Sequence, residues 1–184
     1  MIINVRGTHG SGKSHLVRSI MSAFPCEPLA GVKRPDGYRV EVTHLNRPLY
    51  VVGSYETACG GCDGIQPYSL IWPRVVEYAG LGHVLFEGAL VSSSYGNIGR
   101  DSQVYGDDFV FAFLDTPLAV CLERIAARRR ARGDARPLDP KNTEYKYNNI
   151  LKSIPKIRDE FKRRVVVLGY NRAVPQLLGV LRRG

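Results

Sequence analysis

Residues 7–14 read GTHGSGKS, and this stretch constrains the fold more than any other part of the chain. It matches the pattern GxxxxGK[ST] at every fixed position. The preceding residues 2–6 predict a short strand, and residues 13–24 predict a helix with its apolar side chains on one face. A strand, a glycine-rich loop and a helix in this order indicate a phosphate-binding loop, so we expect a P-loop nucleotide-binding fold.

The spacing of this motif has a physical basis. Its glycines let the backbone curl so that successive N–H groups face phosphate oxygens, and the following helix adds its positive N-terminal end. Lys13 is expected to neutralise the β- and γ-phosphates as a catalytic cation, and the Ser14 hydroxyl to ligate Mg²⁺. The predicted ATP-binding residues of the loop are Gly7, Thr8, His9, Gly10, Ser11, Gly12, Lys13 and Ser14.

Strands and helices alternate along the rest of the chain, which predicts an α/β fold. We expect a P-loop nucleotide-kinase-like domain with a five-stranded, mainly parallel sheet and helices on both faces. The length of 184 residues suits one domain over residues 1–184. Residues 25–37 are expected as a loop, and 38–45 with 49–54 as a β-hairpin. The predicted core strands are 2–6, 49–54, 83–87, 109–114 and 165–169, and the predicted later helices are 67–79 (interrupted by Pro73), 118–133, 143–163 and one from Pro175.

Two carboxylates are expected near the ligand, because ligands of such sheets bind at the carboxyl ends of the strands. Glu87 ends an apolar strand, where an acid can hold Mg²⁺ or accept the proton of an attacking hydroxyl. The other interpretation is that Glu87 caps the next segment. Asp63 lies in a glycine-rich loop and is a candidate general base, or else an ordinary turn residue.

The segment 123–136 carries six arginines against two acids. We expect an arginine-rich lid over about residues 124–142 that closes on the phosphates. Arg128 is the candidate catalytic arginine of this lid, and Arg132 a candidate nucleotide contact. A solvated helix face is the alternative interpretation of such a run.

The sequence CGGC places Cys59 and Cys62 two residues apart. A structural zinc needs four ligands, and no second pair is present, so a zinc clamp is disfavoured. A redox pair is also disfavoured, because such pairs usually open a helix in a thioredoxin-like unit. The expected role is a loop whose glycines allow close approach to the phosphoryl acceptor.

A net charge of +9 calls for a partner or substrate with negative charge. A polyanion such as nucleic acid and a nucleotide substrate both satisfy this. No apolar run reaches the ~20 residues of a membrane span and no signal sequence is evident, so the cytosol is the expected compartment, without a membrane partner. The oligomeric state is left open.

Several blocks together resemble a bacteriophage-associated family of small P-loop kinases, grouped with thymidylate kinases, that contains the 5-hydroxymethyluracil DNA kinases. The blocks are INVRGTHGSGKSHLVR, YETACGGCDGI, HVLFEG, LDTPLAVCLERIAARRRARG and DPKNTEYK, and they cover residues 2 to about 146. The resemblance implies ATP-dependent phosphorylation of the 5-hydroxymethyl group of deoxyuridine already built into DNA. It further implies DNA containing 5-hydroxymethyluracil as the substrate, the host cytoplasm as the compartment of a phage-encoded chain, and a role in hypermodifying thymidine against restriction.

The chain departs from ordinary thymidylate kinases at one position. These carry an Asp-Arg pair after the third strand, whereas this chain has Glu87-Gly88. The missing arginine argues against a mononucleotide phosphate as the acceptor. A small-molecule kinase acting on a free nucleotide and a non-catalytic nucleotide-binding protein remain the alternatives.

A DNA acceptor places a further demand on the chain. The 5-position of a pyrimidine faces the major groove, and a P-loop cleft is too deep to reach it there, so we expect the nucleotide to be flipped out. Basic residues near the end of the chain are candidates to hold the DNA backbone, or else form a solvated helix face: Lys152, Lys156, Arg158, Lys162, Arg163 and Arg164.

Overall fold

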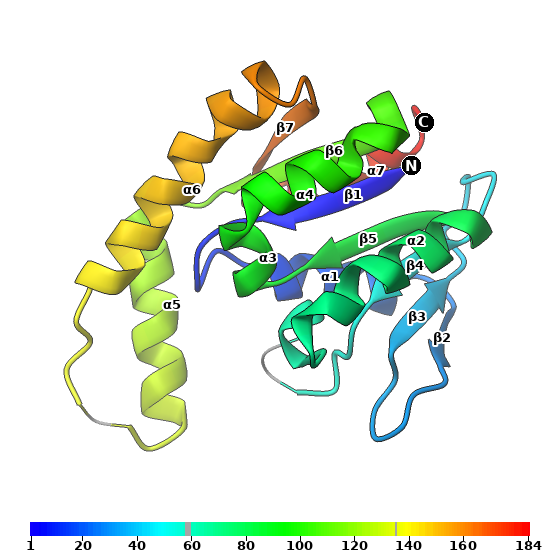
Figure 1. Cartoon of the computed structure of the whole chain (residues 1–184). Helices are drawn as coiled ribbons and strands as arrows, with labels where there is room; N and C mark the ends of the chain where they lie inside the picture. The colour runs from blue at the N-terminus through cyan, green and yellow to red at the C-terminus, as the bar shows by residue number, and fades with distance from the viewer. Residues whose placement is uncertain (58–59, 135) are drawn as a thin grey trace.

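A sheet of seven strands passes through the middle of the molecule (Figure 1). The computed structural model describes residues 1–57, 60–134 and 136–184. The strands lie in the order β2-β3-β4-β5-β1-β6-β7. Their bounds are β1 (Ile2–Arg6), β2 (Cys26–Leu29), β3 (Gly37–Val40), β4 (Leu49–Val52), β5 (His83–Glu87), β6 (Phe109–Asp115) and β7 (Arg164–Gly169).

Five of these strands are the predicted core strands, and they are mutually parallel in the order β4-β5-β1-β6-β7. The prediction of five strands was nevertheless too low, because β3 and β2 extend the sheet by antiparallel pairing. The hairpin of β3 and β4 is confirmed, although β3 ends at Val40 rather than at residue 45. Strand β2 lies in the segment expected as a loop, and its pairing with β3 makes it the edge of the sheet.

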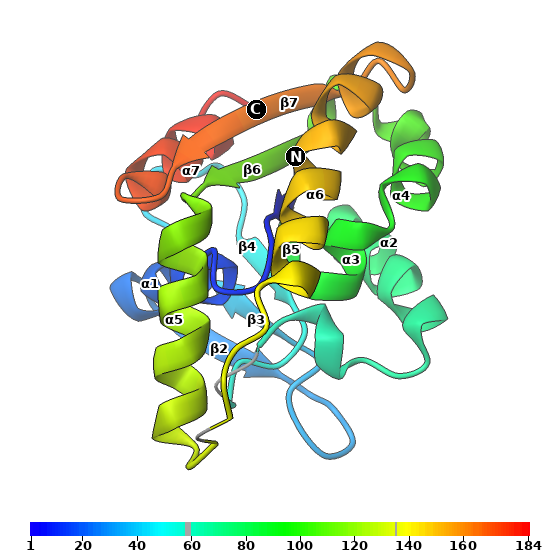
Figure 2. The same cartoon turned by 90° about the vertical axis from the view of Figure 1, so that its left-hand side faces the viewer.

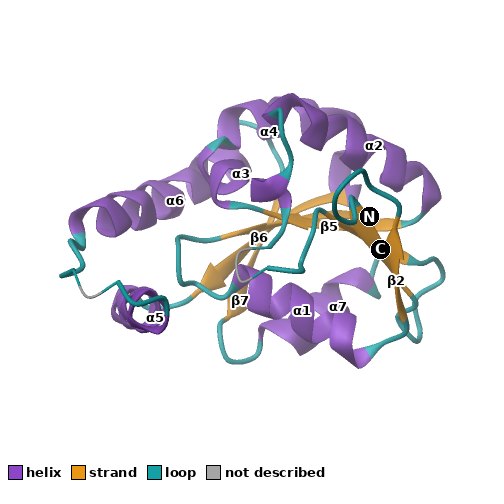
Figure 3. Ribbon diagram, turned by 90° about the horizontal axis from the view of Figure 1, so that it is seen from below, coloured by secondary structure: helices purple, strands orange, loops and turns teal. Residues whose placement is uncertain are grey.

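Helices cover both faces of the sheet, as predicted (Figure 3). Helices α1 and α7 pack on one face, and α2, α3, α4 and α6 cover the other, while α5 lies beside α6. The helices are α1 (Lys13–Ala23), α2 (Ile71–Leu81), α3 (Ala89–Ser93), α4 (Tyr95–Asp101), α5 (Leu118–Ala131), α6 (Lys141–Asp159) and α7 (Ala173–Leu181), with 3-10 turns at Cys62–Gly64, Tyr68–Leu70 and Ser102–Asp108.

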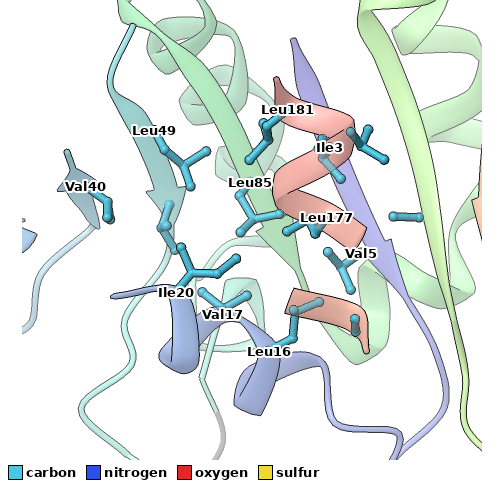
Figure 4. Close-up of a cluster of buried hydrophobic side chains, with 14 of the residues drawn as sticks. Ile3, Val5, Leu16, Val17, Ile20, Val40, Leu49, Leu85, Leu177 and Leu181 are labelled. Atoms are coloured by element: carbon cyan, nitrogen blue, oxygen red, sulfur yellow. The ribbon is translucent and has the colours of Figure 1, made fainter. Parts of the chain in front are cut away.

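The two faces carry separate apolar cores. On the face of α1 and α7, Ile3 and Val5 of the central strand pack with Leu16, Ile20 and Leu177 (Figure 4). On the other face, an aromatic cluster lies under α2, α4 and α6; it includes Phe86, Phe109, Phe111 and Phe113. Because helices cover both faces of the central strand, residues 2–5 are all buried, and all but Asn4 are apolar.

Two helix predictions need correction. Pro73 does not kink a helix, because α2 begins at Ile71 and the proline falls in its first turn, where its missing N–H has no partner to lose. Helix α6 ends at Asp159 rather than at residue 163. Among the described residues, no helix combines the length and the apolar character that a membrane span requires.

The carboxyl ends of the parallel strands meet at one edge of the sheet, which faces the viewer in Figure 2. The loop of residues 7–14 follows β1 at this edge, the glycine-rich loop follows β4, and α3 follows β5. The fold therefore brings three sequence segments far apart in the chain to one place.

Candidate active site

The loop of residues 7–14 curls around the ammonium group of Lys13. The Lys13 Nζ donates hydrogen bonds to the carbonyl oxygens of Gly7 at 2.9 Å and Thr8 at 3.2 Å. The side chain is 7% exposed, and burial lowers its pKa, while the nearby carboxylates of Glu87 and Asp63 oppose that shift. The lysine thus holds a cation inside the loop where the phosphates of a nucleotide would lie.

Gly10 has to be a glycine in this loop. Its φ of +76° lies in the left-handed region, and a Cβ there would stand 2.4 Å from the carbonyl oxygen of Cys121 in α5. The loop is also tied to the end of β6, because the Thr116 hydroxyl donates to the Ser11 carbonyl at 2.7 Å. These contacts fix the loop against two neighbouring elements.

Glu87 ends β5 directly opposite the start of α1. Its Oε1 accepts a hydrogen bond from the Ser14 hydroxyl at 2.7 Å and a longer one from the Tyr55 hydroxyl at 3.4 Å. The glutamate is 1% exposed, and burial raises its pKa, with Lys13 opposing the shift. Burial also raises the pKa of Tyr55, which keeps its hydroxyl protonated as a donor.

Asp63 lies across the cleft from Lys13, at the first residues of α3. Both of its carboxylate oxygens accept the N–H of Ala89, at 2.8 and 2.9 Å, and one also accepts the N–H of Leu90 at 3.3 Å. Asp63 therefore holds the glycine-rich loop against α3 and presents a negative charge to the cleft.

Arg6 holds the opposite end of α3, although the sequence predicted it only as the last residue of a strand. This guanidinium is fully buried and donates to the carbonyl oxygens of Val91, at 3.2 Å, and Ser92, and to Asn4 Oδ1 at 3.0 Å. Burial lowers the pKa of Arg6 to about 9, which still leaves it charged at neutral pH. A five-residue helix too short to be stable alone is thus anchored at both ends by charged side chains.

The glycine-rich loop packs its backbone against Glu87. Gly61 has φ +82° and ψ −152°, and a Cβ at this position would lie 2.6 Å from both the carbonyl oxygen and the Oε1 of Glu87. Arg18 of α1 secures the same loop from the other side: it donates to the carbonyl oxygens of Tyr55 and Thr57, and its guanidinium lies 5.6 Å from the centre of the Tyr55 ring. The space between Gly61 and Glu87 is therefore too small for any side chain at position 61.

Cys62 is the cysteine of the CGGC sequence that lies within the described residues. Cys59 lies outside the described residues. Cys62 is buried at 1% exposure beside the end of β5, and burial raises the pKa of its thiol well above the ordinary value. No group of three histidine, cysteine or acidic side chains suited to a metal ion occurs among residues 1–57, 60–134 and 136–184.

The elements above enclose a cleft of about 310 Å³, which we call the P-loop cleft. Arg124 and Arg128 of α5 line it on one side, and Arg124 donates to the Gly10 carbonyl at 3.3 Å. His9 lines it as well, 3.3 Å from the Lys146 Nζ, and burial together with nearby cations lowers the pKa of His9. The lining residues are His9, Gly10, Gly12, Lys13, Ser14, His15, Arg18, Gly60, Asp63, Glu87, Ala89, Arg124 and Arg128.

The structure brings together most of the residues that the sequence singled out. Lys13, Ser14, Asp63, Glu87 and Arg128 line one cleft, together with His9, Gly10 and Gly12. Gly7, Thr8 and Ser11 form the inner side of the loop, where they line a small space against β6 and α6. Arg132 is different: it follows the last turn of α5, is exposed, and does not line the cleft.

Known proteins similar to this chain include kinases, although no protein-family model matches it. The chain is 37% identical over 163 residues to the 5-hmdU DNA kinase of Pseudomonas phage PaMx11, covering 85% of this chain and 84% of that protein. It is also 37% identical over 135 residues to the 5-hmdU DNA kinase of Pseudomonas phage M6, covering 68% and 71%. Among solved structures, a gluconokinase from Sinorhizobium meliloti 1021 aligns with a TM-score of 0.54 at 15% identity over 98% of this chain and 91% of that one, a likeness in fold.

Proposed function

The chain belongs to the family of the 5-hmdU DNA kinases, and we propose that it transfers the γ-phosphoryl group of ATP to the hydroxyl of 5-hydroxymethyl-2′-deoxyuridine within DNA. The product would be 5-phosphomethyldeoxyuridine, as a step in the hypermodification of phage thymidine in the host cytoplasm. The observation that carries the proposal is the convergence of Lys13, Ser14 and Glu87 on one cleft of a chain with these relatives. The protein is a phosphotransferase, and the identity of the acceptor is the part to be tested.

The triphosphate would lie in the loop of residues 7–14, with its β- and γ-phosphates against Lys13. The Lys13 ammonium now bonds to two carbonyls of its own loop, so it is already in place and needs only to exchange these for phosphate oxygens. Arg128 faces the same space from α5 and would stabilise charge on the transferred group. The segment of about residues 124–142 is proposed as the lid, with Arg132 approaching the nucleotide only if the lid closes.

Ser14 and Glu87 fit the magnesium ion that P-loop kinases use. Their oxygens face each other at 2.7 Å, and Mg²⁺ prefers one or two such protein oxygens together with water and substrate phosphates. The buried Glu87 carboxylate, whose pKa is raised, is a group that a divalent cation would stabilise. When bound there, the ion would neutralise negative charge that develops on the phosphate oxygens.

Asp63 is proposed as the carboxylate on the acceptor side. Glu87 is directed to Ser14, whereas Asp63 is fixed by α3 at the other wall of the cleft. The acceptor oxygen forms a bond to the γ-phosphorus as the bond from that phosphorus to the bridging oxygen of ADP breaks. The acceptor proton passes to Asp63 late in this step, because a loose transition state needs little help from a base.

The reacting hydroxyl cannot approach this cleft from within an intact duplex. The 5-substituent lies in the major groove of DNA, whereas Glu87 and Lys13 are almost wholly buried at the base of the cleft. We therefore propose that the target nucleotide leaves the base stack and enters the cleft alone.

The acceptor assay tests the proposed function. ATP labelled at the γ-phosphate is offered with DNA containing 5-hydroxymethyluracil, with the same DNA containing thymine, and with free 5-hydroxymethyldeoxyuridine monophosphate. Label is expected in the first DNA only. Label in the free nucleotide alone would indicate a small-molecule kinase, and no label in any acceptor would indicate a non-catalytic nucleotide-binding protein.

A further inference from the structure

Helix α6 lies beside α3 and α4 (Figure 2). Residues of these three helices line a second hollow next to the P-loop cleft. Its volume is about 340 Å³, and we call it the α6 groove. Three lysines line it, Lys146, Lys152 and Lys156, together with two tyrosines, Tyr95 and Tyr145. None of the described residues that line it is acidic, so the groove suits a ligand with negative charge.

The residues of α6 that line the groove lie on one side of the helix. Lys146, Ser153 and Lys156 recur along the helix at spacings that place them on one side, toward α3 and α4. Lys156 lies over the Tyr95 ring at 5.9 Å, and its Nζ is 3.4 Å from the Tyr95 hydroxyl. A lysine in contact with an aromatic ring has a defined position, whereas a lysine on a solvated helix face does not.

The groove adjoins the acceptor side of the P-loop cleft at two points. Lys146 lines the groove, and its Nζ lies 3.3 Å from the ring of His9 in the cleft. Helix α3 forms a wall of both spaces, with Ala89 toward the cleft and Ser93 toward the groove. A chain that delivers one residue to the cleft can therefore continue directly into the groove.

Lysines and exposed aromatic rings together are the chemistry that binds a single strand of nucleic acid. Lysine ammonium groups neutralise phosphates, and bases stack on aromatic rings without regard to sequence. Tyr145 is 68% exposed on the groove side of α6. An aromatic side chain that packs in a hydrophobic core would be buried, so packing does not account for Tyr145. Tyr145 is thus a candidate platform for an unpaired base.

We propose that the α6 groove binds the stretch of DNA strand next to the extruded nucleotide, with Lys152 and Lys156 at its phosphates and Tyr145 against a neighbouring base. This inference rests on the proposed function, since it presumes a DNA acceptor. It separates two groups among the basic residues of the C-terminal region: Lys152 and Lys156 line the groove, whereas Arg158 bonds to Asp159 and does not line it. Only the first group is assigned to DNA.

The double variant Lys152→Gln/Lys156→Gln tests the phosphate contacts. We expect the KM for a single-stranded oligonucleotide containing 5-hydroxymethyluracil to rise roughly tenfold, with the KM for ATP unchanged. The slope of log(kcat/KM) against log[salt] should become less steep by about 1.4, since each lost contact to a single strand removes about 0.7. The control is Arg182→Gln/Arg183→Gln, which removes the same charge from exposed residues beyond the end of α7 and should change neither quantity.

Tyr145 supplies an independent test, because its exposure makes misfolding an implausible cause of any effect. Tyr145→Ala should raise the KM for the oligonucleotide at least about fivefold, and Tyr145→Phe should leave it unchanged, since the stacking face is kept. Groove variants that match the control on DNA, while the wild-type protein phosphorylates it, would overturn the inference and leave the proposed function standing. A wild-type protein that phosphorylates no DNA would overturn both.

Discussion

Replacing Gly61 by alanine is expected to damage the site through both the backbone and the Glu87 carboxylate. Gly61 has φ +82° and ψ −152°, a region of backbone conformation that is essentially reserved for glycine. The added Cβ would lie 2.6 Å from the carbonyl oxygen of Glu87 and 2.6 Å from its Oε1. The first of these atoms belongs to the end of a buried strand, so it cannot move aside.

This geometry sets the loss of stability and of activity expected for Gly61→Ala. Backbone strain in this region costs about 1–3 kcal/mol, and the clash adds to it, so the free energy of unfolding should fall by about 2–4 kcal/mol. For a chain of this size that corresponds to a melting temperature lower by about 5–15 °C. To regain an ordinary contact of 3.4 Å, the Glu87 carboxylate must also shift by about 0.8 Å away from the added Cβ. A displacement of this size in a positioned group can lower kcat by roughly 10- to 100-fold.

Gly64→Ala is the matched control in the same loop. A Cβ at Gly64 has no neighbouring atom within 4 Å, so its effect on stability should stay within about 0.5 kcal/mol. Urea unfolding gives the stability of both variants, and phosphoryl transfer at saturating ATP and DNA gives kcat. If Gly61→Ala proves as stable and as active as Gly64→Ala, the loop does not press on Glu87 and the argument is wrong.

Further variants separate the parts of the site. Lys13→Ala should abolish phosphoryl transfer, because it removes the cation that faces the phosphates; full activity would remove the P-loop mechanism. Asp63→Asn should lower kcat with DNA while the KM for ATP stays constant, and a change confined to the KM for ATP would place Asp63 on the nucleotide side. Arg6→Met should lower the free energy of unfolding by about 2 kcal/mol, because carbonyls at the end of α3 lose their donor; an unchanged urea midpoint would contradict that role. Leu177→Ala should cost about 2–5 kcal/mol in the same assay, against under about 1 kcal/mol for the half-exposed Leu81→Ala.

The parts of the fold that the sequence predicts are those set by local patterns. The five parallel strands are continuous apolar runs, and residues 7–14 dictate their own loop geometry through glycine, lysine and serine. The observed order of the strands in the sheet then places Glu87 near Ser14, because β5 and β1 are neighbours. Pattern and topology were sufficient for this much of the site.

The parts that the sequence did not predict depend on partners distant in the chain. The residues Cys26–Leu29 include Glu27 and Pro28, and only their pairing with β3 makes them a strand, at an edge where proline is tolerated. Helix α3 forms because Asp63 and Arg6 bind its two ends, and no signal within its five residues announces either contact. Helix α5 ends at Ala131, so Arg132 lies beyond the helix that carries Arg128, and its contact with the nucleotide stays a prediction.

The position of the transferred phosphoryl group tests the central claim most directly. The substrate is a circular single-stranded DNA containing 5-hydroxymethyluracil, which has no 5′ end to be phosphorylated. After reaction with ATP, the DNA is digested to nucleoside monophosphates by nucleases without phosphatase treatment, and the products are identified by mass spectrometry. We predict a deoxyuridine monophosphate that carries a second phosphoryl group on its 5-hydroxymethyl oxygen, absent with Lys13→Ala. An unmodified circle, with phosphoryl transfer only to linear DNA ends or to free nucleotides, would contradict the account.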